Sequence, residues 1–77
     1  MDNLGELERR VETIWRDVLD AREAPAGATF FELQGQSLSA VRITARIEDE
    51  LSIFVDVGDL FEDPSMETFV RAVVAKA

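Results

Sequence analysis

A serine that follows a glycine-glutamine pair is the residue of this chain best suited to carry a chemical group. Gly35-Gln36-Ser37 stands immediately before an apolar pattern of helical period, so the Ser37 hydroxyl is expected to cap the N-terminus of a helix. Free amides and the positive dipole end at such a position attract phosphate. Gly35 has no Cβ and is expected to let the backbone turn tightly. The sequence therefore predicts a phosphate-binding environment around Ser37.

The composition argues against catalysis by the chain itself. Its 77 residues contain no His, no Cys and no Tyr, which removes the commonest general base, the thiolate nucleophile and the usual nitrogen and sulfur metal ligands. So short a chain also has little structure with which to enclose a deep active site. We expect a protein that is not an enzyme and holds no metal ion.

Charge and hydropathy indicate the class of partner. With 16 acidic and 8 basic residues the net charge is -8, which disfavours binding to nucleic acid and to anionic membranes and favours basic protein partners. No apolar run is long enough to span a bilayer, and the N-terminus does not resemble a signal peptide, so we expect a cytoplasmic protein. Between Arg46 and Arg71 every charged residue is acidic. These residues are Glu48, Asp49, Glu50, Asp56, Asp59, Glu62, Asp63 and Glu67.

The pattern of apolar residues predicts an all-α fold of three main helices and one short helix. Apolar residues recur every three or four positions over residues 4–19 and 37–51, and again from residue 66 towards the C-terminus. Asp63-Pro64-Ser65 is a start signal for the last helix, because proline fits the first helical position and Asp63 or Ser65 supplies the cap. Residues 53–57 have strand propensity but no partner strand, so they are interpreted as an extended connector before a short turn over residues 58–62. The predicted stripes are Leu4, Leu7, Val11, Ile14, Trp15, Val18 and Leu19; Ala40, Ile43, Ile47 and Leu51; Met66, Phe69, Val70 and Val73.

Residues 21–36 are predicted to form a long loop between the first two main helices. They contain Pro25, Gly27 and Gly35 and show no helical period. Loops of this length in small domains are usually functional or held by their own side chains. Phe30, Phe31 and Leu33 are the expected anchors.

Two segments resemble a known family. Phe30-Phe31-Glu32-Leu33-Gln34-Gly35-Gln36-Ser37-Leu38-Ser39-Ala40 resembles the phosphopantetheine attachment motif of peptidyl carrier domains in nonribosomal peptide synthetases, and Asp59-Leu60-Phe61-Glu62-Asp63-Pro64-Ser65 is similar to the stretch before the family's last helix. The resemblance covers most of the chain. It implies a single carrier (thiolation) domain over residues 1–77 with the acyl-carrier-protein fold.

The resemblance also implies a function. A phosphopantetheinyl transferase, using coenzyme A and magnesium ion, would attach a 4'-phosphopantetheine arm to Ser37, beside Gly35 and Gln36. The arm would hold an aminoacyl or peptidyl group as a thioester, delivered by an adenylation domain and passed to condensation, tailoring or thioesterase domains. This chain has Gln34 where the family usually has a second glycine, and Gln36 where it has histidine or aspartate. We interpret Gln34 as a sign that the loop needs no positive φ there, and Gln36 as a possible influence on the choice of transferase.

A partner surface is predicted beside the serine. Leu38 and Val41 lie off the core stripe of their helix and are expected to form an exposed apolar patch with Val57. The alternative is that this face packs on the long loop. Arg42 and Arg46 lie one turn apart and are candidates for contact with a partner protein or the phosphodiester, or for a salt-bridged surface with Glu50.

Other functions compatible with the sequence are an acyl carrier of a polyketide or fatty acyl pathway, and a helical docking module whose serine is never modified. Phe30-Phe31 and Gln36 favour the peptidyl type. We expect a monomer.

Overall fold

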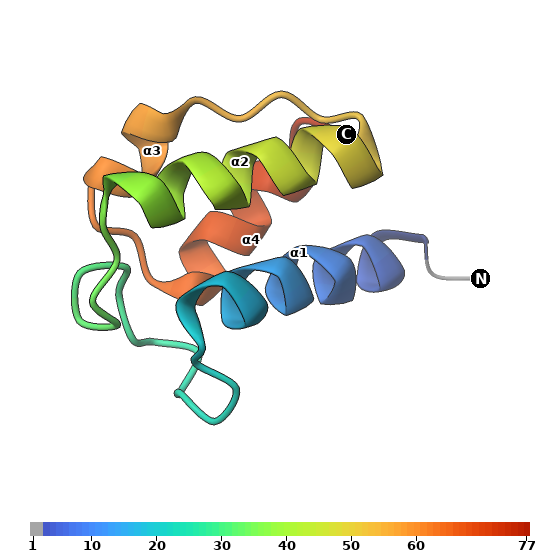
Figure 1. Cartoon of the computed structure of the whole chain (residues 1–77). Coiled ribbons are helices and arrows are strands. Elements are labelled where there is room, and N and C mark those ends of the chain that lie inside the picture. The colour runs from blue at the N-terminus through green and yellow to red at the C-terminus, as the bar shows by residue number, and fades with distance from the viewer. Residues whose placement is uncertain (1–2) are drawn as a thin grey trace.

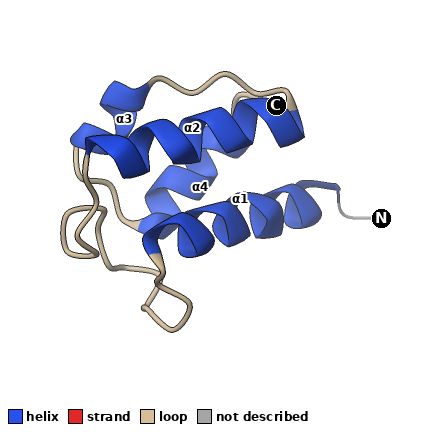
Figure 2. Cartoon of the chain, in the orientation of Figure 1, coloured by secondary structure: helices blue, strands red, loops and turns tan. Residues whose placement is uncertain are grey.

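A computed structural model describes residues 3–77 and confirms the all-α prediction. The helices are α1 (Asn3–Leu19), α2 (Ser37–Leu51), α3 (Val57–Phe61) and α4 (Met66–Val74). Over this range the extended pairing is limited to one isolated antiparallel bridge between Thr29 and Ser65, and Figure 2 shows helices and loops only. α1 and α2 run side by side in opposite directions, and α4 crosses behind them (Figure 1). No helix within residues 3–77 is long and apolar enough to cross a membrane.

The predicted apolar stripes meet in one core. Trp15 lies at its centre, with ring centroids 6.1 Å from Phe30 and 5.4 Å from Phe69. Of the stripe residues, Leu4 is 60% exposed, and four are half-buried against the core: Leu7, Val18, Leu19 and Leu51. The assignment of Leu4 to the core was therefore wrong, because the first turn of α1 extends beyond the helices that pack on it. The buried members are Val11, Ile14, Trp15, Ala40, Ile43, Ile47, Met66, Phe69, Val70 and Val73.

The segment between α2 and α3 is the extended connector that the sequence predicted. Ile53 and Val55 are buried, whereas Phe54 between them is 69% exposed, the alternation expected of extended backbone. α3 begins at Val57, one residue earlier than predicted, because the carboxylate of Asp56 accepts a hydrogen bond of 2.8 Å from the Gly58 amide and caps the helix.

The start of α4 differs from the prediction in the position of its proline. Ser65, one of the two residues predicted for the cap, is the N-cap and accepts a hydrogen bond from the Thr68 amide at 3.2 Å. Pro64 lies before the cap, so its predicted place at the first helical position was wrong. The reason is tertiary: the Pro64 carbonyl accepts a hydrogen bond of 2.9 Å from the amide of Phe30 in the long loop. α4 also ends at Val74 and does not continue to the C-terminus.

The long loop, residues 20–36, is tied to the helices at both ends. Near its start, Nη1 of Arg16 donates hydrogen bonds to the carbonyls of Ala21, Arg22 and Ala24 at 2.8–3.1 Å. Further along, the amides of Met66 and Glu67 donate to the carbonyls of Ala28 and Ala26, each at 3.2 Å. Phe30 is fully buried and Leu33 packs against the core, so both anchor the loop as predicted. Phe31 is 49% exposed and lies outside the core, but its ring packs on that of Phe30 at a centroid distance of 5.6 Å.

Candidate functional site

Ser37 is the first residue of α2, as predicted, and it is exposed, but it does not cap the helix. The N-cap position belongs to Gln36, which has extended backbone angles (φ -135°, ψ 175°) and makes no side-chain capping bond. Within residues 3–77, the Ser37 hydroxyl has no hydrogen-bond partner. The prediction of Ser37 as N-cap was therefore wrong by one residue. Because no side chain caps α2, its first amides stay available to an acceptor such as phosphate.

Gly35 is required for space. Its amide donates a hydrogen bond of 2.8 Å to the Phe30 carbonyl, which closes the loop just before Ser37. A Cβ on Gly35 would collide with the buried ring of Phe30, at 2.5 Å from Cζ and 2.6 Å from Cδ1. Gly35 has no positive φ. The role of Gly35 is thus to let the Phe30 ring approach the backbone beside Ser37. This agrees with the prediction that the position needs a residue without a Cβ.

Gln34 departs from the prediction made for it. Its φ is 63°, in the left-handed region, where a side chain costs about 1–2 kcal/mol and glycine is nearly free of strain. Its amide donates a hydrogen bond of 2.9 Å to the Phe31 carbonyl, which sets the tight turn. The inference that this loop needs no positive φ was wrong: the turn keeps that conformation, and glutamine adopts it.

The predicted apolar patch is brought together in part. Leu38 is 61% and Val41 is 52% exposed, so this face of α2 does not pack on the long loop. Val41 and Val57 line a groove of about 320 Å³ between α2 and the connector, together with Phe54. Leu38 is exposed but does not line the groove, and Val57 is half-buried against the core. Phe54 was missed by the sequence reasoning, although alternation with Ile53 and Val55 was the available signal.

The two arginines of α2 have different surroundings. Arg46 lies 2.9 Å from Oε2 of Glu50 through Nε, and 3.6 Å from Oδ2 of Asp17 on α1 through Nη1. Arg46 therefore forms the salt-bridged surface with Glu50 that was one of its two predicted roles. Arg42 is exposed and forms no ion pair within residues 3–77, so it remains the candidate for partner contact.

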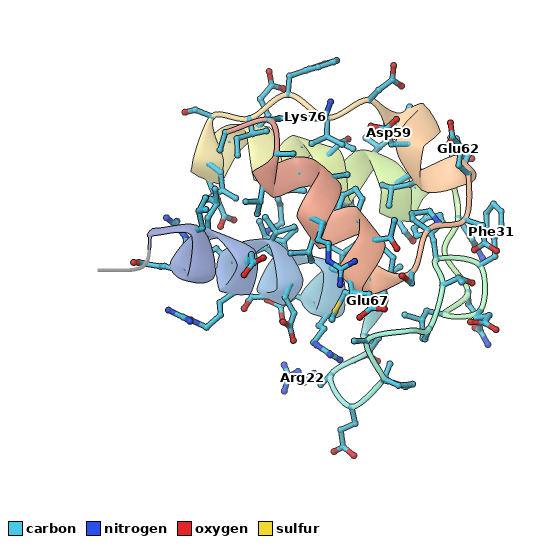
Figure 3. The ribbon with its side chains drawn as sticks, turned by 180° about the vertical axis from the view of Figure 1, so that it is seen from behind. Arg22, Phe31, Asp59, Glu62, Glu67 and Lys76 are labelled. Atoms are coloured by element: carbon cyan, nitrogen blue, oxygen red, sulfur yellow. The ribbon has the colours of Figure 1, made fainter. Side chains whose placement is uncertain are left out.

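The acidic stretch contains both structural and unengaged carboxylates. Asp63 has a φ of 60° and accepts a hydrogen bond of 2.8 Å from the Phe31 amide, so it holds the long loop against the start of α4. Asp56 caps α3, as described above. Figure 3 shows Asp59 and Glu62 extending from the region of α3. Two of the eight acidic side chains therefore lie at α3, the helix that begins at Val57.

Comparison with known proteins gives consistent matches. Residues 9–73 match the family model described as the phosphopantetheine attachment site. The chain is 36% identical over 73 residues to phosphinothricin tripeptide synthetase PhsC of Streptomyces viridochromogenes, covering 95% of this chain and 7% of that protein. It is 36% identical over 63 residues to bacitracin synthase 3 of Bacillus licheniformis, covering 82% of this chain and 1% of that protein.

A solved structure with the same fold is that of BlmI, a type-II acyl-carrier-protein from Streptomyces verticillus involved in bleomycin biosynthesis. It superposes with a TM-score of 0.78 at 26% identity, over 94% of this chain and 87% of BlmI. The chain spans only 7% and 1% of the length of the two relatives cited above.

Proposed function

Because the chain belongs to the phosphopantetheine attachment family, we propose that it is a peptidyl carrier domain whose arm is attached to Ser37 and carries intermediates of nonribosomal peptide biosynthesis. The observation that carries the proposal is the environment of Ser37: an exposed hydroxyl without a partner, on the uncapped first turn of α2. These residues fit a phosphodiester, because free amides stabilise its negative charge. The relatives whose names denote peptide synthetases support the peptidyl type over a fatty acyl carrier.

In the proposed attachment reaction, the Ser37 oxygen forms a new bond to the phosphorus that bears the pantetheine in coenzyme A. The bond between the two phosphates breaks, adenosine bisphosphate leaves, and the hydroxyl proton passes to a base of the transferase. The chain itself supplies position and exposure, and it contains no histidine or cysteine that would act as a base or nucleophile.

The attached arm would supply a thiol that holds aminoacyl and peptidyl groups as thioesters. The protein would present these groups to adenylation, condensation, tailoring or thioesterase domains, and the tether would raise the effective concentration of the cargo at each of them. The exposed side chains Val41, Leu38 and Arg42 lie within two turns of Ser37 and are proposed as part of the contact surface. Val57 would contribute through the groove that it shares with Val41.

Intact-mass measurement tests this proposal. The wild type is incubated with coenzyme A, magnesium ion and a broad-specificity phosphopantetheinyl transferase, alongside Ser37→Ala and Ser39→Ala. Ser39 is a matched control because it lies two residues further along the same helical turn. We expect one added phosphopantetheine on the wild type and on Ser39→Ala, and none on Ser37→Ala. A wild type that several transferases leave unmodified would instead favour an unmodified docking module.

A further inference from the structure

Phe54 is the most exposed large apolar side chain in residues 3–77. It is 69% exposed, against 61% for Leu38 and 60% for Leu4. Its neighbours in the connector, Ile53 and Val55, are both buried, and extended backbone points alternate side chains to opposite sides. The fold therefore requires an outward side chain at position 54, but it does not require an apolar one.

Phe54 is not an isolated apolar residue, because it lines the groove of about 320 Å³ between α2 and the connector. From α2, the exposed side chains of Val41 and Ala45 line the same groove. Its floor contains Val55 and Thr44, which are buried. Figure 1 shows the connector running along α2 on the side away from α1. Single apolar residues on a surface are common, whereas several around a hollow indicate a place where another molecule binds.

The groove suits an apolar side chain better than a polar ligand. The Thr44 hydroxyl donates a hydrogen bond of 3.1 Å to the Val41 carbonyl of its own helix, and no buried side-chain polar atom in residues 3–77 lacks a partner. A polar ligand would thus find no unpaired buried group to orient it. The volume of the groove is also at the lower end of the roughly 300–1,000 Å³ of small-molecule pockets. A side chain of a partner protein therefore fits it better than a whole ligand.

The charged residues at the groove are acidic. Among the described residues, its lining contains Glu48 and Asp56 and no base. The Asp56 carboxylate caps α3, whereas Glu48 is exposed and its carboxylate forms no hydrogen bond or ion pair within residues 3–77. Arg46 lines the next hollow along α2 and is already paired with two carboxylates. A Lys or Arg of a partner would therefore meet an unpaired carboxylate next to the apolar groove.

The groove lies on the face of α2 that begins at Ser37. Ser37, Val41 and Ala45 are spaced by four residues, which places them on one side of the helix. The rise from Ser37 to Ala45 is about 12 Å, at about 1.5 Å per residue. An enzyme whose active site reaches the Ser37 hydroxyl therefore covers this face. Among the partners of the proposed function this applies to the transferase, because the others act on the thiol at the far end of the arm.

We propose that Phe54 is a docking anchor for the phosphopantetheinyl transferase, which inserts an apolar side chain between Phe54 and Val41 and places a Lys or Arg beside Glu48. The inference rests on the proposed attachment to Ser37 and names a surface that the transferase recognises. Burial of the Phe54 ring supplies binding energy, because large aromatic anchors dominate the energy of many interfaces. Glu48 acts mainly on the rate of encounter, since attraction between exposed charges operates before contact.

Steady-state loading kinetics test the anchor. The full-length apo protein is varied in concentration with a broad-specificity transferase, coenzyme A and magnesium ion, and intact mass gives the rate of loading. Phe54→Ser is compared with Leu4→Ser, which removes a similarly exposed apolar side chain at the start of α1, outside the groove. We expect the KM of Phe54→Ser to rise about tenfold with kcat unchanged, as for the loss of an interface anchor. Leu4→Ser should behave as the wild type.

Melting curves of both variants should stay close to that of the wild type, because exposed positions contribute little to stability. A wild type that does not load at all refutes the proposed function and the inference with it. Normal loading of the wild type, with equal KM values for Phe54→Ser and Leu4→Ser, overturns the anchor alone. A Phe54→Ser variant that is unfolded at the assay temperature also overturns it, since Phe54 would then be needed for the fold.

A second variant pair tests the basic contact at Glu48. Glu48→Gln removes the charge and keeps the shape, and Glu8→Gln is the matched control, because Glu8 is an exposed carboxylate on α1 outside the groove. Added sodium chloride should lower kcat/KM of the wild type, because it screens attraction between exposed charges. We expect a shallower salt dependence for Glu48→Gln and the wild-type dependence for Glu8→Gln. Equal salt dependence in the two variants would contradict the contact at Glu48.

Discussion

Replacement of Gly35 by alanine should destabilise the domain through one crowded contact. The added Cβ would lie 2.5 Å from Cζ and 2.6 Å from Cδ1 of Phe30. The Phe30 ring cannot move away easily, since it is fully buried, with ring centroids 6.1 Å from Trp15 and 6.5 Å from Phe61. The backbone amide of Phe30 also donates a hydrogen bond to the Pro64 carbonyl. Overpacking of this kind costs about 1–3 kcal/mol, which for a domain of this size lowers the melting temperature by roughly 5–20 °C.

Thermal and urea unfolding of Gly35→Ala would measure this cost, with Gly27→Ala as the matched control. A Cβ at Gly27 meets nothing within 4 Å, and neither glycine has a positive φ. The control should therefore be neutral or up to about 1 kcal/mol more stable. Adding Phe30→Leu should make the Gly35→Ala change less costly, because the two residues share one contact. Equal unfolding midpoints for Gly35→Ala and Gly27→Ala would refute the claim that a Cβ at Gly35 collides with the Phe30 ring.

Three further predictions concern the loop and the exposed face of α2. Gln34→Gly should stabilise the fold by about 0.5–1 kcal/mol in urea unfolding, since it relieves a left-handed φ at a residue with a side chain; a less stable variant would contradict the strain. Arg16→Gln should cost about 2 kcal/mol in the same assay, because it removes charged hydrogen bonds to three loop carbonyls, whereas Arg9→Gln on the exposed face of α1 should change little. Val41→Asp should shift stability by no more than about 0.5 kcal/mol, as expected for a residue that is 52% exposed, while slowing transfer by a partner domain; unchanged transfer would remove Val41 from the contact surface.

The helices and the core were predictable from the sequence because one-sided apolar periodicity follows directly from burial. Ala40, Ile43 and Ile47 were assigned to the core from spacing alone and are all fully buried. Ser37 was placed at the start of α2 by the same pattern together with the motif around it. The exposure of Val41 followed from its rotation away from the core stripe.

The details of the turns were less predictable, because they depend on contacts between distant segments. The turn at Gln34 is closed by a local hydrogen bond to the Phe31 carbonyl. Its position on the protein, however, depends on the packing of Phe30 against Trp15 on α1. Pro64 and Asp63 are held by hydrogen bonds to Phe30 and Phe31, about thirty residues earlier in the chain. No local signal identifies such partners. A groove of about 870 Å³ was missed for the same reason, since its walls come from the end of α1, from residues 20–24 and from residues 32–36.

The central claim, that Ser37 carries the arm, is tested most directly by locating the modification within the chain. Trypsin releases a single fragment, residues 23–42, that contains Ser37, Ser39 and Thr29. Tandem mass spectrometry of this fragment, taken from protein loaded with coenzyme A and a transferase, assigns the added mass to one hydroxyl. The account predicts phosphopantetheine on Ser37 alone. Phosphopantetheine on Ser39 or Thr29, or an unmodified fragment, would contradict it.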